Sequence, residues 1–136
     1  MKFYRNVSEM IGGTPLLRLE RFSMDTEMYA KCELMNPLSV KDRPVLQIIQ
    51  DAEESGDLKP GGTLIEATSG NTGMAVASIA AVRGYKAILV MSEIQSLERR
   101  KVLNAPGAEL VLTPASEGTK GAKQKMQEIL EENPDY

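Results

Sequence analysis

Glu66-Ala67-Thr68-Ser69-Gly70-Asn71-Thr72-Gly73 is the stretch on which the fold depends, because it joins two elements of different type. The run Thr63–Ala67 before it favours a β-strand, and the apolar run Met74–Val82 after it favours a buried helix. The first N–H groups of such a helix lack intrahelical partners and lie at the positive end of its dipole, which suits an anion. The same residues also suit an ordinary capped turn with Asn71 or Ser69 as the N-cap. Both interpretations stay open from these residues alone.

Strand and helix patterns alternate along most of the remaining chain. Strands are predicted at Met28–Leu34, Thr63–Ala67, Lys86–Met91 and Glu109–Thr113, and helices within Val40–Glu54 and at Thr72–Arg83, Ser96–Asn104 and Gly118–Glu132. Such β-α repeats imply a parallel sheet with helices on both faces. We therefore predict an α/β fold, a three-layer α-β-α domain with a mostly parallel four-stranded sheet. Residues 1–27 do not follow the alternation, so we expect a leader at 1–27 and an α/β domain at 28–136.

The first helix has one clear apolar face and two candidate starting points. Its inward side chains are predicted from their i, i+3, i+4, i+7 spacing to be Val45, Ile48, Ile49 and Ala52. Ser39 and Asp42 have the spacing of a capping box, which would begin the helix at Ser39. Pro44 would then fall inside the helix, where it costs about 3 kcal/mol, so a start near Pro44 is the alternative.

Composition excludes several classes of function. The chain has 136 residues, a net charge of −3, one cysteine and no histidine. Its basic residues are dispersed, which argues against nucleic acid or an anionic membrane as partner, and we expect Glu98-Arg99-Arg100 to form a solvated helix face and not a phosphate clamp. Intrachain disulfides, cysteine-based metal sites and histidine-based catalysis are excluded, and no metal is expected. No apolar run reaches membrane-spanning length and no signal-peptide layout is present, so we expect a cytoplasmic protein.

Four further segments carry a family resemblance when they are taken together with Thr68–Gly73. They are Ile11-Gly12-Gly13-Thr14-Pro15-Leu16, Asn36-Pro37-Leu38-Ser39-Val40-Lys41-Asp42-Arg43, Ser96-Leu97-Glu98-Arg99-Arg100 and Gly107-Ala108-Glu109-Leu110. In this order the five segments resemble the signatures of the cysteine synthase (O-acetylserine sulfhydrylase) family. That family consists of enzymes that depend on pyridoxal 5′-phosphate and have the tryptophan-synthase β-subunit fold type.

The resemblance implies a set of site residues and a reaction. Lys41 would bind the cofactor covalently and remove the α-proton of the substrate, and Asn71 would hydrogen-bond the phenolic oxygen of the cofactor. The residues that would bind the carboxylate of the amino-acid substrate are Thr68, Ser69, Gly70 and Thr72. The reaction would convert O-acetylserine and sulfide into cysteine by β-elimination and β-replacement. Without the resemblance, Lys41 would be taken as an ordinary surface lysine at a helix cap.

Length sets this chain apart from the family it resembles. Chains of the family are more than twice as long, and their second half carries a glycine-rich loop that binds the cofactor phosphate. No such loop occurs in this sequence, so one hypothesis is a truncated cysteine synthase-like enzyme that is incomplete by itself. The alternative is a catalytically silent remnant that binds anions or carboxylates, or acts as a regulatory partner of a full-length homologue. In either case, apolar leader segments left uncovered favour a homodimer or pairing with a homologue.

Overall fold

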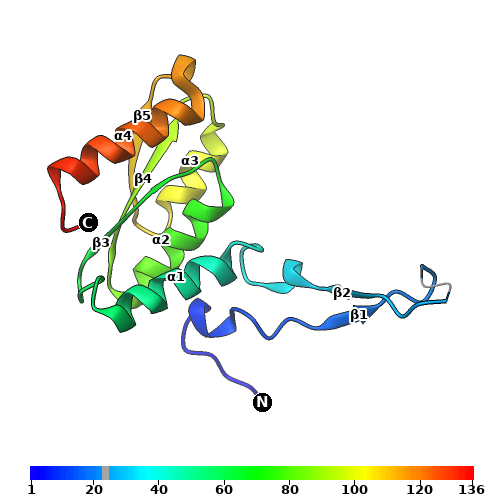
Figure 1. The fold of residues 1–136 in the computed structure, drawn as a ribbon. Coiled ribbons are helices and arrows are strands. Elements are labelled where there is room, and N and C mark those ends of the chain that lie inside the picture. Colours follow the sequence, from blue (N-terminus) through cyan, green and yellow to red (C-terminus); the bar gives the residue numbers. More distant parts are fainter. Residues whose placement is uncertain (23–24) are drawn as a thin grey trace.

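A three-stranded parallel sheet lies at the centre of the computed structural model, which describes residues 1–22 and 25–136 (Figure 1). Its strands are β3 (Thr63–Ala67), β4 (Lys86–Ser92) and β5 (Glu109–Thr113), in the order β3-β4-β5. The middle strand is covered on both faces, so its residues Leu89, Val90 and Met91 are completely buried. This burial explains why β4 reads as a continuous aliphatic run and not as an alternating pattern.

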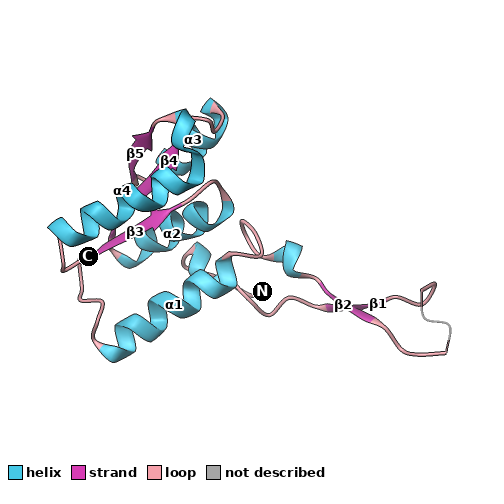
Figure 2. Ribbon diagram, turned by 45° about the horizontal axis from the view of Figure 1, so that its top comes forward, coloured by secondary structure: helices cyan, strands magenta, loops and turns pink. Residues whose placement is uncertain are grey.

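Helices cover both faces of the sheet. On one face α2 (Asn71–Arg83) packs against β3 and β4, and α3 (Leu97–Asn104) packs against α2 and β5. On the same side as α2 and α3, α1 (Asp42–Ser55) packs against the outer side of α2. On the other face α4 (Gly118–Glu132) crosses all three strands (Figure 2). The arrangement confirms the predicted α/β fold with helices on both sides of a parallel sheet.

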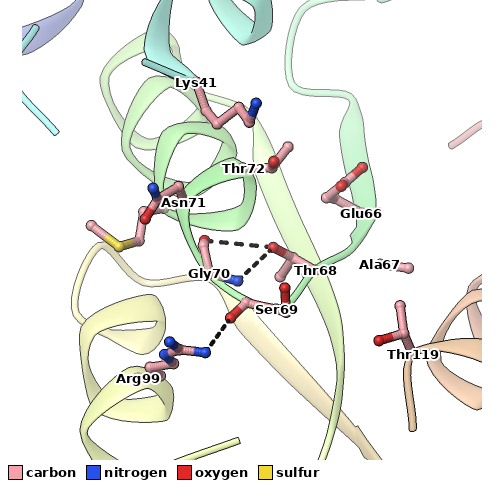
Figure 3. A pocket seen from close by; sticks show the side chains of 11 residues that line it. Lys41, Glu66, Ala67, Thr68, Ser69, Gly70, Asn71, Thr72, Arg99 and Thr119 are labelled. Atoms are coloured by element: carbon pink, nitrogen blue, oxygen red, sulfur yellow. Dashed lines mark hydrogen bonds between the residues drawn. The ribbon is translucent and has the colours of Figure 1, made fainter. Parts of the chain in front are cut away.

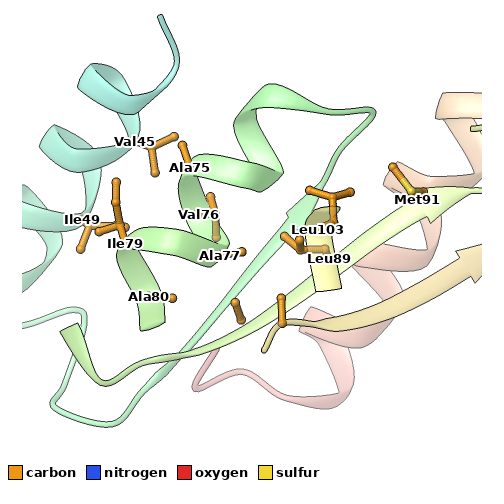
Figure 4. Close-up of a cluster of buried hydrophobic side chains, with 12 residues drawn as sticks. Val45, Ile49, Ala75, Val76, Ala77, Ile79, Ala80, Leu89, Met91 and Leu103 are labelled. Carbon is orange, nitrogen blue, oxygen red and sulfur yellow. The ribbon is translucent and has the colours of Figure 1, made fainter. Parts of the chain in front are cut away.

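The hydrophobic core lies around α2. Small residues let this helix approach its neighbours closely, and the side chains that meet there are Val45, Ile49, Ala75, Val76, Ala77, Ile79, Ala80, Leu89, Met91 and Leu103, with Ala87 and Ala108 (Figure 4). Burying a large aliphatic side chain such as Ile79 or Leu89 contributes roughly 1.5–3 kcal/mol. The helix α2 therefore packs against α1, α3 and the sheet, and these contacts fix its position at the site.

The N-terminal part of the chain forms a separate hairpin. Here β1 (Leu16–Arg18) pairs antiparallel with β2 (Tyr29–Lys31), and the pair projects away from the rest of the molecule (Figures 1 and 2). The short 3₁₀ helices η1 (Val7–Met10), η2 (Glu33–Met35) and η3 (Ala115–Glu117) complete the described elements.

The position of β2 corrects one detail of the sequence-based prediction. The strand expected at Met28–Leu34 was counted as a member of the main sheet, but Tyr29–Lys31 pairs only with the leader strand, so the sheet has three described strands instead of four. A strand pattern in the sequence does not specify the partner strand. The backbone of Tyr29–Lys31 pairs with Leu16–Arg18, only about a dozen positions upstream. The proposed boundary between residues 27 and 28 falls between β1 and β2 and stays a prediction.

Most element bounds agree closely with the sequence patterns. The bounds of β3, β5 and α4 are the predicted ones, while α2 begins one residue earlier, at Asn71, and β4 extends to Ser92. On α1, Val45 and Ile49 are buried as predicted, but the prediction was wrong for Ile48, which is 66% exposed. Because α1 rests mainly on α2, it buries only a narrow stripe. No helix in the described part of the chain is both long and apolar enough to cross a membrane.

Candidate functional site

A pocket of about 430 Å³ opens where β3 ends and α2 begins. All six residues predicted for the site line it, namely Lys41, Thr68, Ser69, Gly70, Asn71 and Thr72 (Figure 3). The other lining residues are Glu66, Ala67, Met74, Arg99 and Thr119, which the sequence did not single out for the site. The pocket lies beyond the carboxyl end of an open parallel sheet, the usual ligand position in such folds. The structure thus brings together the lysine segment and the turn before α2, which are well separated in the sequence.

The turn between β3 and α2 is closed by Thr68. Its hydroxyl oxygen accepts hydrogen bonds from the N–H groups of Gly70 (3.2 Å) and Gly73 (3.0 Å), and its own N–H donates to the Val90 carbonyl (2.9 Å). The N-cap position is Gly70, with no side-chain cap, so the prediction of Asn71 or Ser69 as N-cap was wrong. A side chain two residues before the cap was missed because its hydroxyl reaches forward across the turn.

This arrangement leaves backbone donors available at the start of α2. Within the described chain, the N–H groups of Asn71 and Thr72 make no hydrogen bond, because Thr68 satisfies only Gly70 and Gly73. Unpaired N–H groups at the positive end of a helix dipole favour an anionic ligand. The turn therefore presents toward the pocket two backbone donors that are free within the described chain, an arrangement that favours an anion.

Gly73 is required by the same turn. A Cβ at this position would lie 2.4 Å from Thr68 Cγ2 and 2.9 Å from Thr68 Oγ1, closer than real Cβ atoms approach such neighbours. The glycine therefore allows Thr68 to lie flat against the first turn of α2.

Lys41 stands immediately before α1, at its N-cap position. Its N–H donates to Ser39 Oγ (3.1 Å), and the buried Asp42 carboxylate accepts from the N–H groups of Leu38 (2.8 Å) and Ser39 (3.1 Å). The helix thus begins at Asp42, between the two predicted starts. Pro44 falls in its first turn, where a missing N–H costs nothing. Figure 3 shows the Lys41 side chain extending over Thr72.

A polar cluster behind Lys41 holds the loop that carries it. Arg43 donates to both carboxylate oxygens of Glu33 (2.9 and 2.7 Å) and to Thr14 Oγ1 (3.2 Å), and Thr14 Oγ1 donates to Glu33 (2.8 Å). Asn36 donates to Glu33 (3.0 Å) and accepts from the N–H of Gly12 (2.9 Å). These contacts join the segments Gly12–Thr14 and Asn36–Arg43, and the second of these segments carries Lys41. We refer to these five residues as the Glu33 cluster.

Hydrogen bonding strongly lowers the pKa of the carboxyl group at the centre of this cluster. The bonds from Arg43, and then that from Thr14, lower the pKa of Glu33 from its usual 4.5 to about 2. Sequence reasoning missed Glu33 because it lies outside the recognised segments and acts only through contacts made in the folded chain.

The charged residues around the pocket are mixed but mainly cationic. The lining includes two cations, Lys41 and Arg99, and one carboxylate, Glu66. Burial raises the pKa of Glu66, and the charge of Lys123 lowers it in smaller part. Burial therefore disfavours the negative charge of Glu66, which leaves the lining of the pocket more positive. No group of side chains able to hold a metal ion occurs within the described residues.

Arg99 was expected on a solvated helix face, and the structure gives it a second role. The residue is exposed, yet its Nη1 donates to the Ser69 carbonyl (3.3 Å) and to Gln95 Oε1 (2.6 Å) at the edge of the pocket (Figure 3). Nothing in the sequence pattern indicates this contact, because it depends on how α3 docks beside the turn.

Relatives with similar sequences include cysteine synthases. This chain is 52% identical over 136 residues to the cysteine synthase of a Flavobacterium species, covering 98% of this chain and 44% of that protein. It is 50% identical over 131 residues to the cysteine synthase of Staphylococcus aureus, covering 94% and 42% of the two chains. The chain thus spans less than half the length of the relatives that it matches.

Solved structures give the same picture. O-acetyl serine sulfhydrylase isoform 3 from Entamoeba histolytica superposes with a TM-score of 0.89 at 41% identity, covering 98% of this chain and 42% of that one. An O-ureido-L-serine synthase superposes with a TM-score of 0.84 at 44% identity, covering 96% and 42%. The family model described as pyridoxal-phosphate dependent enzyme matches residues 7–136, nearly the whole sequence. The chain therefore belongs to the family of pyridoxal-phosphate dependent enzymes.

Proposed function

We propose that this chain provides the lysine-bearing and carboxylate-binding part of a cysteine synthase site, which converts O-acetylserine and sulfide into cysteine and acetate. Pyridoxal phosphate is the cofactor of the family. One observation carries the proposal: Lys41 and the turn Thr68–Thr72 line the same pocket at the start of α2. The similarity to cysteine synthases over almost the whole chain supports the choice of reaction.

The pocket fits one side of this cofactor. The aldehyde of the cofactor needs an amine with which to form an imine, and Lys41 offers one. The phenolic oxygen of the cofactor needs a hydrogen-bond donor, and the side-chain amide of Asn71 offers one. The substrate carboxylate needs several N–H or O–H donors, and the turn held by Thr68 and Gly73 supplies them. A glycine-rich cup for the phosphate is absent from the described residues that line the pocket.

The predicted site residues would then divide the work between proton transfer and binding. Bound pyridoxal phosphate would withdraw electrons from the α-carbon of the substrate, which makes its proton removable. Lys41 Nζ would accept that proton. The N–H groups of Asn71 and Thr72, with the hydroxyls of Ser69 and Thr72, would hold the substrate carboxylate and so orient the α-carbon toward Lys41. Asn71 Nδ2 would donate to the phenolic oxygen of the cofactor.

An absorbance spectrum tests the proposal. The purified chain would be incubated with pyridoxal phosphate and desalted, alongside Lys41→Ala and the control Lys101→Ala, which removes an exposed lysine of α3 outside the pocket. We expect a band near the visible edge in the wild type and in Lys101→Ala, and its loss in Lys41→Ala. O-Acetylserine should shift the band. A band of equal strength in Lys41→Ala would contradict the role of Lys41.

A second candidate function is binding without chemistry, in which the chain holds small carboxylates or serves as a regulatory partner of a full-length homologue. The observation that favours it is the pair of backbone donors at Asn71 and Thr72, which have no partner among the described residues and need no cofactor to attract an anion. Acetate binding in a chain that gives no cofactor band would support this second function over the first.

We further infer that the chain pairs with a second copy or a homologue. The hairpin β1–β2 supports this inference, because Leu16 is 64% exposed, Leu17 56% and Tyr29 51%. Apolar side chains on an isolated two-stranded ribbon need a covering surface. In this proposal the leader 1–27 supplies most of the contact through β1, β2 adds Tyr29, and the α/β domain lies within residues 28–136.

A further inference from the structure

We propose that Arg99 is a positioning residue that fixes the peptide unit between Ser69 and Gly70 in the carboxylate-binding turn. This inference rests on the proposed function of that turn and names a residue from a different element that would keep the turn in its binding shape.

The peptide unit is held at both ends. Arg99 Nη1 donates to the Ser69 carbonyl (3.3 Å), and the N–H of Gly70 donates to Thr68 Oγ1 (3.2 Å), as the dashed lines in Figure 3 show. Because a trans peptide is planar, its C=O and N–H groups point in opposite directions. A flip of this unit would therefore break both hydrogen bonds together. Since Gly70 lacks a Cβ, the backbone itself opposes a flip only weakly, and the two contacts determine the orientation.

Arg99 is well placed to act on the turn from outside. Its Nη1 also donates to Gln95 Oε1 (2.6 Å), and its backbone N–H donates to Ser96 Oγ (3.4 Å), the N-cap of α3. The helix itself is anchored in the core by Leu103, which is 1% exposed. The guanidinium group thus extends from a fixed helix toward the turn.

The positive charge of Arg99 lies beside the same turn. No carboxylate lies within ion-pair distance of its guanidinium in the described part of the chain. Its neighbour Arg100 has a different role, because Arg100 Nη2 donates to the Glu93 carbonyl in the loop before α3. Of the two adjacent arginines, only Arg99 lines the pocket.

The test compares Arg99→Gln and Arg99→Lys with Lys101→Gln, which removes an equal charge from an exposed position of α3 outside the pocket. NMR would record the carbonyl ¹³C resonance of Ser69 and the amide resonance of Gly70, and acetate would be titrated as the carboxylate probe. In Arg99→Gln we expect both resonances to move and the affinity for acetate to fall about three- to tenfold. Lys101→Gln should match the wild type. Arg99→Lys keeps the charge but not the planar fork, so its Ser69 resonance should also move.

Two results would overturn the inference. One is a set of unchanged Ser69 and Gly70 resonances in Arg99→Gln, whatever happens to acetate affinity, because any loss would then come from charge alone. The other is equal acetate affinity in Arg99→Gln and the wild type. Failure of the proposed function has a different signature, since the wild type would then give no cofactor band, whether or not it binds acetate. The resonances of Ser69 and Gly70 would still report whether Arg99 holds the turn.

Discussion

At the scale of single residues, the pocket depends on a close fit between Thr68 and Gly73. The Thr68 hydroxyl satisfies two amides of the turn, and it reaches the second only because Gly73 has no side chain. The sequence showed that small polar residues gather here, because composition alone reveals that. It did not show which of them closes the turn, because this depends on a contact of 3.0 Å across five positions.

Gly73→Ala should therefore disturb both the turn and the stability of the fold. The new Cβ would lie 2.4 Å from Thr68 Cγ2, so either the Thr68 side chain or the first turn of α2 must move. Overpacking of this kind costs about 1–3 kcal/mol. Urea unfolding should show a lower midpoint with an unchanged slope, and acetate binding should weaken.

The double variant Thr68→Ser with Gly73→Ala serves as the control for this prediction. Serine removes the methyl group responsible for the closest contact and keeps the hydroxyl, so part of the lost stability should return. If Gly73→Ala alone unfolds at the wild-type urea concentration, the close fit is not what restricts this position to glycine.

At the scale of elements, the patterns that predicted β3, β5 and α4 correctly are local ones. A short aliphatic run followed by a turn, or an apolar stripe with helical spacing, identifies such an element without reference to its neighbours. The partner of a strand is not local information, and for this reason Met28–Leu34 was assigned to the wrong sheet. Ile48 was assigned to the core for a similar reason, since spacing does not tell how wide a stripe the neighbouring helix covers.

The Glu33 cluster links the leader, η2 and α1, and it predicts a specific response to acid. Because the pKa of Glu33 is lowered to about 2 from 4.5, its contribution to stability is fully present above pH 4.5 and is lost as the pH falls toward 2. Glu33→Gln should lower the unfolding midpoint near neutral pH. The difference between the wild type and this variant should shrink as the pH falls through that window.

Urea unfolding at several pH values measures this effect, with Glu54→Gln as the matched control. Glu54 is an exposed residue of α1 with no side-chain hydrogen bond or ion pair to any described residue, so its replacement removes one carboxylate without breaking a contact. A difference between Glu33→Gln and the wild type that stayed constant from neutral pH down to 2 would show that the carboxylate does not stabilise the fold through its charge.

At the scale of the whole molecule, the chain has two parts that differ in how well other elements cover their apolar side chains. The α/β part encloses its own core, whereas the hairpin β1–β2 has no covering layer on either face among the described residues. Leu16 and Leu17 are adjacent in β1 and so point to opposite faces, yet both are more than half exposed. A two-stranded ribbon of this kind is marginally stable in water, so the arrangement favours association that covers it.

Self-association should therefore depend on the hairpin. Sedimentation velocity of the wild type should show a concentration-dependent dimer, and Leu16→Ser with Leu17→Ser should weaken it at least about tenfold, since each buried leucine contributes roughly 1.5–3 kcal/mol. Ile48→Ser is the matched control, because Ile48 is as exposed as Leu16 but lies on α1, away from the hairpin. Equal weakening by Ile48→Ser would place the contact elsewhere, and a wild type that stays monomeric at every concentration would rule out pairing with a second copy. Retention of the cofactor band in the leucine variant would further show that the Lys41 pocket forms within one chain, which separates the assembly of the molecule from the chemistry of its site.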